Sequence, residues 1–134
     1  MPASVKRRDS RRSHFNLILA GHNYGWPVLS FGTRDDGAPI SSEIQRDGMD
    51  PPIINWTPEI AVSAIAFYDG AEFPRWRGNL LVGSLVQRGL MRVVLATERA
   101  VLQETIVDDL GRIRAIAVDS AGVIYRVIEL RLAV

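Results

Sequence analysis

The chain has 134 residues, of which 47% are hydrophobic and 23% are charged, and its formal net charge at pH 7 is +1. This length suits one globular domain, and so small a net charge gives no overall field that would favour nucleic acid as a partner. The chain lacks cysteine, which excludes disulfides and thiolate chemistry, and no apolar run approaches the roughly 20 residues of a membrane-spanning helix.

The first 14 residues are basic and include the run KRRDSRR at residues 6–12. Such a run can open a signal peptide, but only the short stretch FNLILA follows it, and Asn16 interrupts that stretch. A basic arm can also bind nucleic acid or a membrane surface, although a solvated tail is the better interpretation. We therefore expect a disordered basic tail over residues 1–14, followed by one folded domain over residues 15–134.

Residues 21–27 have the sequence GHNYGWP, which leaves little room for a helix or a regular strand. Its two glycines permit positive φ angles, and its proline fixes its own φ. We expect a shaped loop that a short strand at Phe15–Leu19 enters and that Tyr24 and Trp26 brace by packing. Residues 32–60 are rich in Gly, Pro, Asp and Ser and predict a long, functionally important connection.

The second half of the chain shows β-strand patterns with almost no helix. Four β-prone runs separated by turn residues come first: Val62–Phe67, Asn79–Leu85, Leu90–Ala96 and Val101–Val107. Four short sequential strands with tight connections describe an antiparallel meander, the arrangement of one β-propeller blade. A small β-sandwich would also explain the pattern, but it has little reason to carry the long connection before residue 60.

Two further runs, Ile113–Val118 and Val123–Glu129, flank the sequence DSAG at residues 119–122. Polar residues and glycine favour a turn, so these runs predict a hairpin. Residues Leu130–Val134 can add an edge strand. The predicted fold class is therefore all-β.

Residues 21–27 resemble the GxNYGWP segment of the soluble quinoprotein sugar dehydrogenases, the glucose/sorbosone and aldose sugar dehydrogenase family. The resemblance continues, in the family's order, through NWTPEIAVS at 55–63, AFYDG at 66–70, FPRWRGNLLVG at 73–83 and LGRIR at 110–114. It covers about residues 15–128 and matches the C-terminal part of the family's sequence. The resemblance implies a fragment of a six-bladed β-propeller, with about two to three of the blades.

Arg112 and Arg114 are the strongest candidates for binding a ligand. They alternate with Ile113 at the start of a strand, so both guanidinium groups are expected on one face, where they repel unless an anion lies between them. By resemblance, this pair contacts pyrroloquinoline quinone, which is a tricarboxylate. The alternative is a pair of surface salt bridges to Asp108 and Asp109.

Two more residues are implied in cofactor binding. Trp56 lies in the proline-rich connection, where it either packs in the core or, by resemblance, lines the cofactor and sugar pocket. Some relatives carry a cofactor-binding lysine in the turn that matches SLVQRG at residues 84–89. In this chain Arg88 can supply that charge, although a plain hairpin turn explains the segment equally well.

The resemblance implies oxidation of an aldose hydroxyl, with electrons passed to pyrroloquinoline quinone and with calcium polarising the cofactor. The family's catalytic histidine and calcium ligands belong to upstream blades, and neither His14 nor His22 matches that histidine. We therefore expect no catalytic residue, no metal ligand and no turnover by this chain alone, unless another chain supplies the missing blades. The alternative is a non-enzymatic, carbohydrate- or ligand-binding propeller fragment. The family is largely periplasmic, but this chain shows no export signal, so its location stays open.

Overall fold

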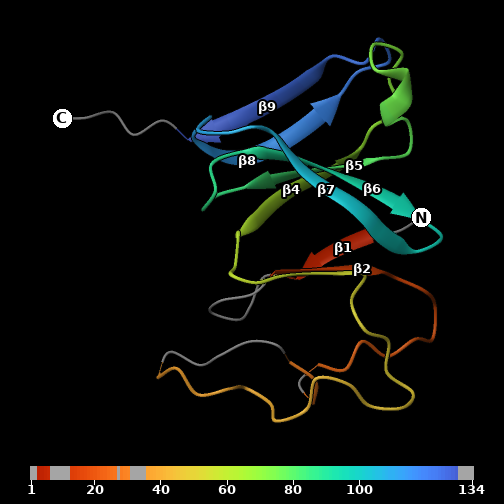
Figure 1. Ribbon diagram of the computed structural model, residues 1–134, viewed down its shortest axis with the longest axis vertical. Coiled ribbons are helices and arrows are strands. Elements are labelled where there is room, and N and C mark those ends of the chain that lie inside the picture. The colour runs from red at the N-terminus through yellow and green to blue at the C-terminus, as the bar shows by residue number, and fades with distance from the viewer. Residues whose placement is uncertain (1–2, 7–12, 27, 31–35, 130–134) are drawn as a thin grey trace. The chain divides into compact units, whose positions relative to one another are not determined.

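The computed structural model describes residues 3–6, 13–26, 28–30 and 36–129, and their regular structure is almost entirely β (Figure 1). The described helical structure is one short 3₁₀ turn, η1, at Pro74–Trp76. Within the described ranges, no helix is long and apolar enough to cross a membrane. The chain divides into two compact units, Met1–Glu59 and Ile60–Val134. The all-β prediction is confirmed.

The first unit contains a three-stranded antiparallel sheet in the order β1-β2-β3. Its strands are β1 (Ala3–Lys6), β2 (Ser13–Leu17) and β3 (Ile54–Trp56). The prediction of a disordered tail over residues 1–14 is therefore wrong for residues 3–6 and 13–14. Pairing with β2 gives the backbone groups of β1 their hydrogen-bond partners, an effect that the basic composition of the tail does not reveal. Residues 1–2 and 7–12 of that tail lie outside the described residues.

Residues 21–26 of the GHNYGWP segment form a loop, as was predicted, and Pro27 lies outside the described residues. Gly21 and Gly25 have φ angles of 79° and 83°. The Tyr24 hydroxyl donates a hydrogen bond to the carbonyl of Leu17 and accepts one from the amide of Leu19, both at 2.7 Å. Tyr24 thus braces the loop against the end of β2, whereas the Trp26 side chain stays 46% exposed.

The proline-rich connection ends earlier than the sequence suggested. Its described residues form bends and turns with one isolated bridge between Leu29 and Glu43, and then β3 begins at Ile54. Trp56 is consequently a strand residue and not a loop residue. The amide of Ile53 donates to the carbonyl of Phe15 at 2.9 Å, so pairing with β2 turns this segment into a strand.

The second unit contains a four-stranded antiparallel meander in the order β4-β5-β6-β7. The strands are β4 (Val62–Phe67), β5 (Leu80–Ser84), β6 (Leu90–Ala96) and β7 (Arg99–Val107). All four predicted runs are therefore strands. The arrangement is that of one propeller blade.

A two-stranded hairpin, β8 (Arg112–Val118) with β9 (Ile124–Glu129), belongs to the same unit (Figure 1). One core joins it to the four-stranded sheet, because Ile113 of β8 is buried with Tyr68, Leu81 and Leu90. The predicted hairpin is confirmed. The suggested edge strand at Leu130–Val134 lies outside the described residues.

Candidate functional site

The position of β8 is fixed by Ile113, which lies between the two candidate arginines. Its side chain is 0% exposed, and its carbonyl accepts a hydrogen bond from the Ser63 hydroxyl. Because the Ser63 hydroxyl also donates to the Gly83 carbonyl at 3.0 Å, it ties β8 to the sheet of β4 and β5. The apolar anchor leaves the side chains of Arg112 and Arg114 39% and 44% exposed.

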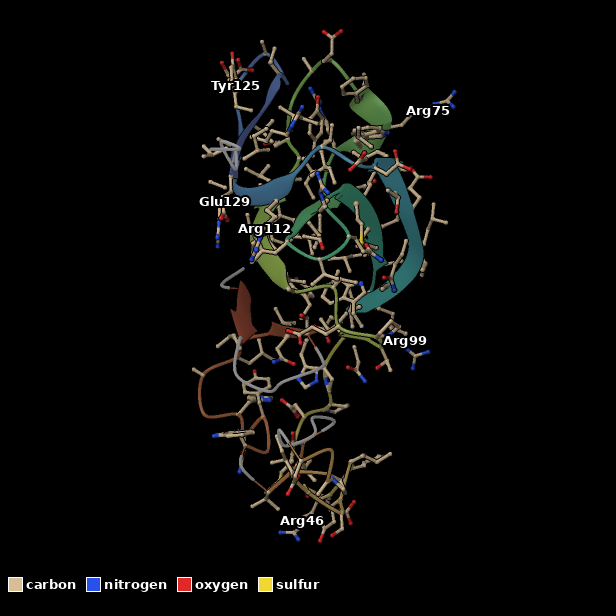
Figure 2. The ribbon with its side chains drawn as sticks, turned by 90° about the vertical axis from the view of Figure 1, so that its left-hand side faces the viewer. Arg46, Arg75, Arg99, Arg112, Tyr125 and Glu129 are labelled. Carbon is tan, nitrogen blue, oxygen red and sulfur yellow. The ribbon has the colours of Figure 1, made fainter. Side chains whose placement is uncertain are left out.

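Both arginines approach one carboxylate oxygen, Oε2 of Glu129. The Nη2 of Arg114 donates a hydrogen bond to it, and the Nε of Arg112 lies 3.6 Å from it. In Figure 2, Arg112 and Glu129 lie together on one side of the second unit, whereas Arg75 and Arg99 lie on the other side. Because both guanidinium groups approach the same oxygen, they lie on one face of the hairpin, as expected. The expected alternative partners, Asp108 and Asp109, do not form these ion pairs.

A β-bulge explains this geometry. Arg112 is opposite Glu129 and Ile113 is opposite Ile128, but the next paired residue is Ala115, which leaves Arg114 as the extra residue. A bulge redirects a side chain and bends the strand, so strict alternation no longer decides the direction of Arg114. Without the bulge, the hairpin register would place residue 130, and not Glu129, opposite Arg112.

The chemistry of this cluster suits a carboxylate ligand. Guanidinium groups bind carboxylates through charge-assisted hydrogen bonds, and this pair already holds one carboxylate of the protein. The Nε of Arg112 is a buried polar atom with no hydrogen-bond partner, so the cluster keeps one unused donor. These donors fit the carboxylates of pyrroloquinoline quinone.

Arg88 lies next to the loop that leads into β8. Its carbonyl accepts a hydrogen bond from the amide of Leu110 at 2.7 Å, and its Nη2 lies 3.4 Å from Oδ1 of Asp109. Its φ angle is 56°, and its side chain is 56% exposed. The backbone of Arg88 thus contacts Leu110, two residues before Arg112, and its side chain already has a surface carboxylate as its partner.

Trp56 belongs to the first unit and is only 6% exposed. Such burial agrees with the packing role that the sequence left open. Its contact with the cofactor stays a prediction.

No cluster of three or more His, Asp or Glu side chains that could hold a metal ion occurs among the described residues. The Nδ1 of His22 lies 2.6 Å from Oδ2 of Asp50, and this pair joins the GHNYGWP loop to the proline-rich connection.

Glu129 is the residue of the candidate site that the sequence analysis did not predict. The hairpin turn at residues 119–122 was a usable signal, because it brings the end of β9 to the start of β8. The bulge places Glu129 opposite Arg112, and no local sequence pattern predicts that bulge.

Comparison with known proteins identifies the family of this chain. The model of the Glucose / Sorbosone dehydrogenase family matches residues 9–132. Over 111 residues the chain is 35% identical to the uncharacterized protein slr1608 of Synechocystis, covering 82% of this chain and 27% of that protein. Over 114 residues it is 31% identical to the aldose sugar dehydrogenase YliI of Escherichia coli, covering 82% of this chain and 30% of the relative.

Solved structures share the fold. A glucose dehydrogenase crystal structure superimposes with a TM-score of 0.79 at 33% identity, over 86% of this chain and 34% of that one. The pyrroloquinoline-quinone-bound form of an aldose sugar dehydrogenase from Streptomyces coelicolor gives a TM-score of 0.66 at 22% identity, over 94% of this chain and 33% of that one. The chain spans about a third of these proteins, and its fold is part of a β-propeller, as predicted. Since the family model matches nearly every residue, the chain belongs to the glucose/sorbosone dehydrogenase family.

Proposed function

We propose that this chain is the part of a quinone-dependent sugar dehydrogenase that holds the carboxylates of pyrroloquinoline quinone. When bound, that cofactor accepts electrons from an aldose hydroxyl. The residues of this chain bind and orient it, with Arg112 and Arg114 as the main anchors. One observation carries the proposal: both arginines converge on a single carboxylate oxygen of Glu129.

Arg88 and Trp56 complete the proposed cofactor-binding set. Arg88 adds a positive charge beside the loop that leads into β8, where it strengthens the attraction for a polyanion. The flat indole of Trp56 suits a planar quinone or the apolar face of a sugar. The pyrroloquinoline-quinone-bound relative from Streptomyces coelicolor supports this choice of cofactor.

The proposed chemistry also needs a general base and calcium ligands, which the family resemblance places on other blades. We propose that these groups come from a chain that carries those blades. Positioned general bases contribute about 10²–10⁴-fold to a rate, so this chain alone is expected to bind the quinone without oxidising sugar.

A binding titration tests the proposal. Purified chain is mixed with pyrroloquinoline quinone, and binding is followed by quenching of tryptophan fluorescence. Replacing Arg112 and Arg114 together by alanine is expected to weaken binding about tenfold or more, because two charge-assisted interactions are lost. The double variant Arg75→Ala with Arg99→Ala removes the same charge from exposed positions elsewhere in the unit and is the control.

Equal weakening by the two double variants would show nonspecific attraction and would contradict the proposal. A parallel assay with calcium, pyrroloquinoline quinone and an aldose measures dye reduction. Sugar-dependent reduction by this chain alone would contradict the idea that another chain supplies the base.

A further inference from the structure

Glu129 occupies the arginine pair that the proposed function assigns to the cofactor. We infer that its carboxylate is an internal competitor, which a carboxylate ligand must displace before it binds Arg112 and Arg114. This inference rests on the proposed function, and it names the residue of this chain that weakens the affinity of the site.

The Glu129 carboxylate forms a hydrogen bond with only one of the two arginines. A single oxygen of Glu129 faces both guanidinium groups, and it hydrogen-bonds Arg114 but stays 3.6 Å from the Nε of Arg112. The Nε of Arg112 has no hydrogen-bond partner. A ligand carboxylate placed between the arginines can use both donors, so the exchange of one carboxylate for another is favourable.

The cluster is also accessible enough for this exchange. The side chain of Glu129 is 34% exposed, and those of Arg112 and Arg114 are 39% and 44% exposed. Ion pairs at such positions are weak, because water screens them and long side chains lose rotamer freedom. Glu129 ends β9 and pairs with Arg112 through the backbone, so its side chain can turn away while the strand pairing stays intact.

The charges of the cluster indicate how loss of the Glu129 carboxylate changes the affinity for an anion. Two guanidinium groups face one carboxylate, whereas Asp109 pairs with Arg88. Replacing Glu129 by glutamine removes the competing charge and leaves both arginines to the ligand. Binding of an anion is therefore expected to tighten when this carboxylate is lost.

The test is a titration of the full chain with pyrroloquinoline quinone, followed by fluorescence quenching, with dissociation constants as the readout. Glu129→Gln is expected to bind about three to ten times more tightly than the unmodified chain, the range that its two exposed ion pairs together can account for. The control is Glu104→Gln. Glu104 also forms a cross-strand pair with an arginine, at 2.7 Å from Arg92, and its loss is expected to change the constant less than about twofold.

The outcomes separate this inference from the proposed function. If the unmodified chain binds through Arg112 and Arg114 but Glu129→Gln binds no more tightly, the inference is wrong and the proposed function stands. Equal tightening by both glutamine variants indicates a general charge effect and also overturns it. If no form of the chain binds the quinone, both ideas fail.

Glu129→Asp is a second test in case the glutamine variant does not fold. Thermal unfolding checks that each variant is folded. Glu129→Asp keeps the charge but shortens the reach toward the arginines, so binding tighter than that of the unmodified chain is expected. Unchanged or weaker binding by a folded Glu129→Asp protein would count against displacement.

Discussion

Asp119 shows how one side chain holds a turn of this fold together. Its Oδ1 accepts hydrogen bonds from the amides of Gly122 at 2.8 Å and Val123 at 2.9 Å, and its Oδ2 accepts one from the Tyr125 hydroxyl at 3.1 Å. The hydrogen bond from the Val123 amide is the main cause that lowers the pKa of Asp119 below its ordinary value. The Asp119 carboxylate in turn raises the pKa of Tyr125, mainly through their hydrogen bond.

These shifts predict a pH-dependent effect of Asp119→Asn. A carboxylate with a lowered pKa stabilises the folded state fully above its ordinary pKa of about 3.9, and this contribution is lost as the pH falls through the lower, folded-state pKa. The variant is therefore expected to melt a few degrees below the unmodified chain at neutral pH, and the gap should narrow in acid. Melting curves at stepped pH values measure it, with exposed Asp69→Asn as the control. A gap that stays constant with pH would contradict the assignment.

At the scale of elements, two glycines let the β8–β9 turn approach the loop after β4. A Cβ at Gly122 would meet the Tyr68 hydroxyl and lie 2.8 Å from the amide nitrogen of Glu72, and a Cβ at Gly70 would meet the backbone of Gly122. The Tyr68 hydroxyl donates to the Gly122 carbonyl at 3.0 Å, so the close approach is also hydrogen-bonded. The hairpin is thus attached to the blade by contacts that tolerate no added side chain.

Gly122→Ala is therefore expected to lower the free energy of unfolding by roughly 3 kcal/mol, from backbone strain together with overpacking. Gly78→Ala is the matched control. Gly78 also has a positive φ, 77°, but nothing lies within 4 Å of an added Cβ, so only a strain cost of about 1–2 kcal/mol is expected. Chemical denaturation of both variants gives the comparison. Equal losses would show that strain alone matters.

The strands that the sequence predicted best are those whose ends are marked by local turn residues. The runs Val62–Phe67 and Leu90–Ala96 are β4 and β6 to the residue, because turn residues bound each of them. The strands β1 and β3 escaped prediction, since one lies in a basic segment and the other follows prolines. Both strands depend on pairing with β2, and for β3 this pairing is a long-range contact. Local strand propensity does not predict such pairing.

At the scale of the whole molecule, the sequence predicted that Arg112 and Arg114 share one face, but it did not predict that Glu129 is their partner. The two arginines could be singled out because the LGRIR motif that contains them is local in the chain. The partner, Glu129, is set by the hairpin register and by the bulge at Arg114, and these come from pairing between strands. Asp108 and Asp109 were the expected partners because they are close in sequence. In the structure, Arg112 and Arg114 instead form ion pairs with Glu129 on the facing strand, β9.

The last prediction concerns β9, whose neighbour among the described strands is β8. Tyr125 and Val127 are 55% and 59% exposed, so this strand presents apolar side chains next to its outer edge. Such edges favour pairing with other chains, and a lysine on them opposes it. We expect the purified chain to associate as its concentration rises, and Val127→Lys to reduce the mass measured by light scattering after size-exclusion chromatography.

Val86→Lys, at a 63% exposed turn position between β5 and β6, adds the same charge elsewhere and should leave association unchanged. An unmodified chain that stays monomeric at every concentration would show that this edge is already protected.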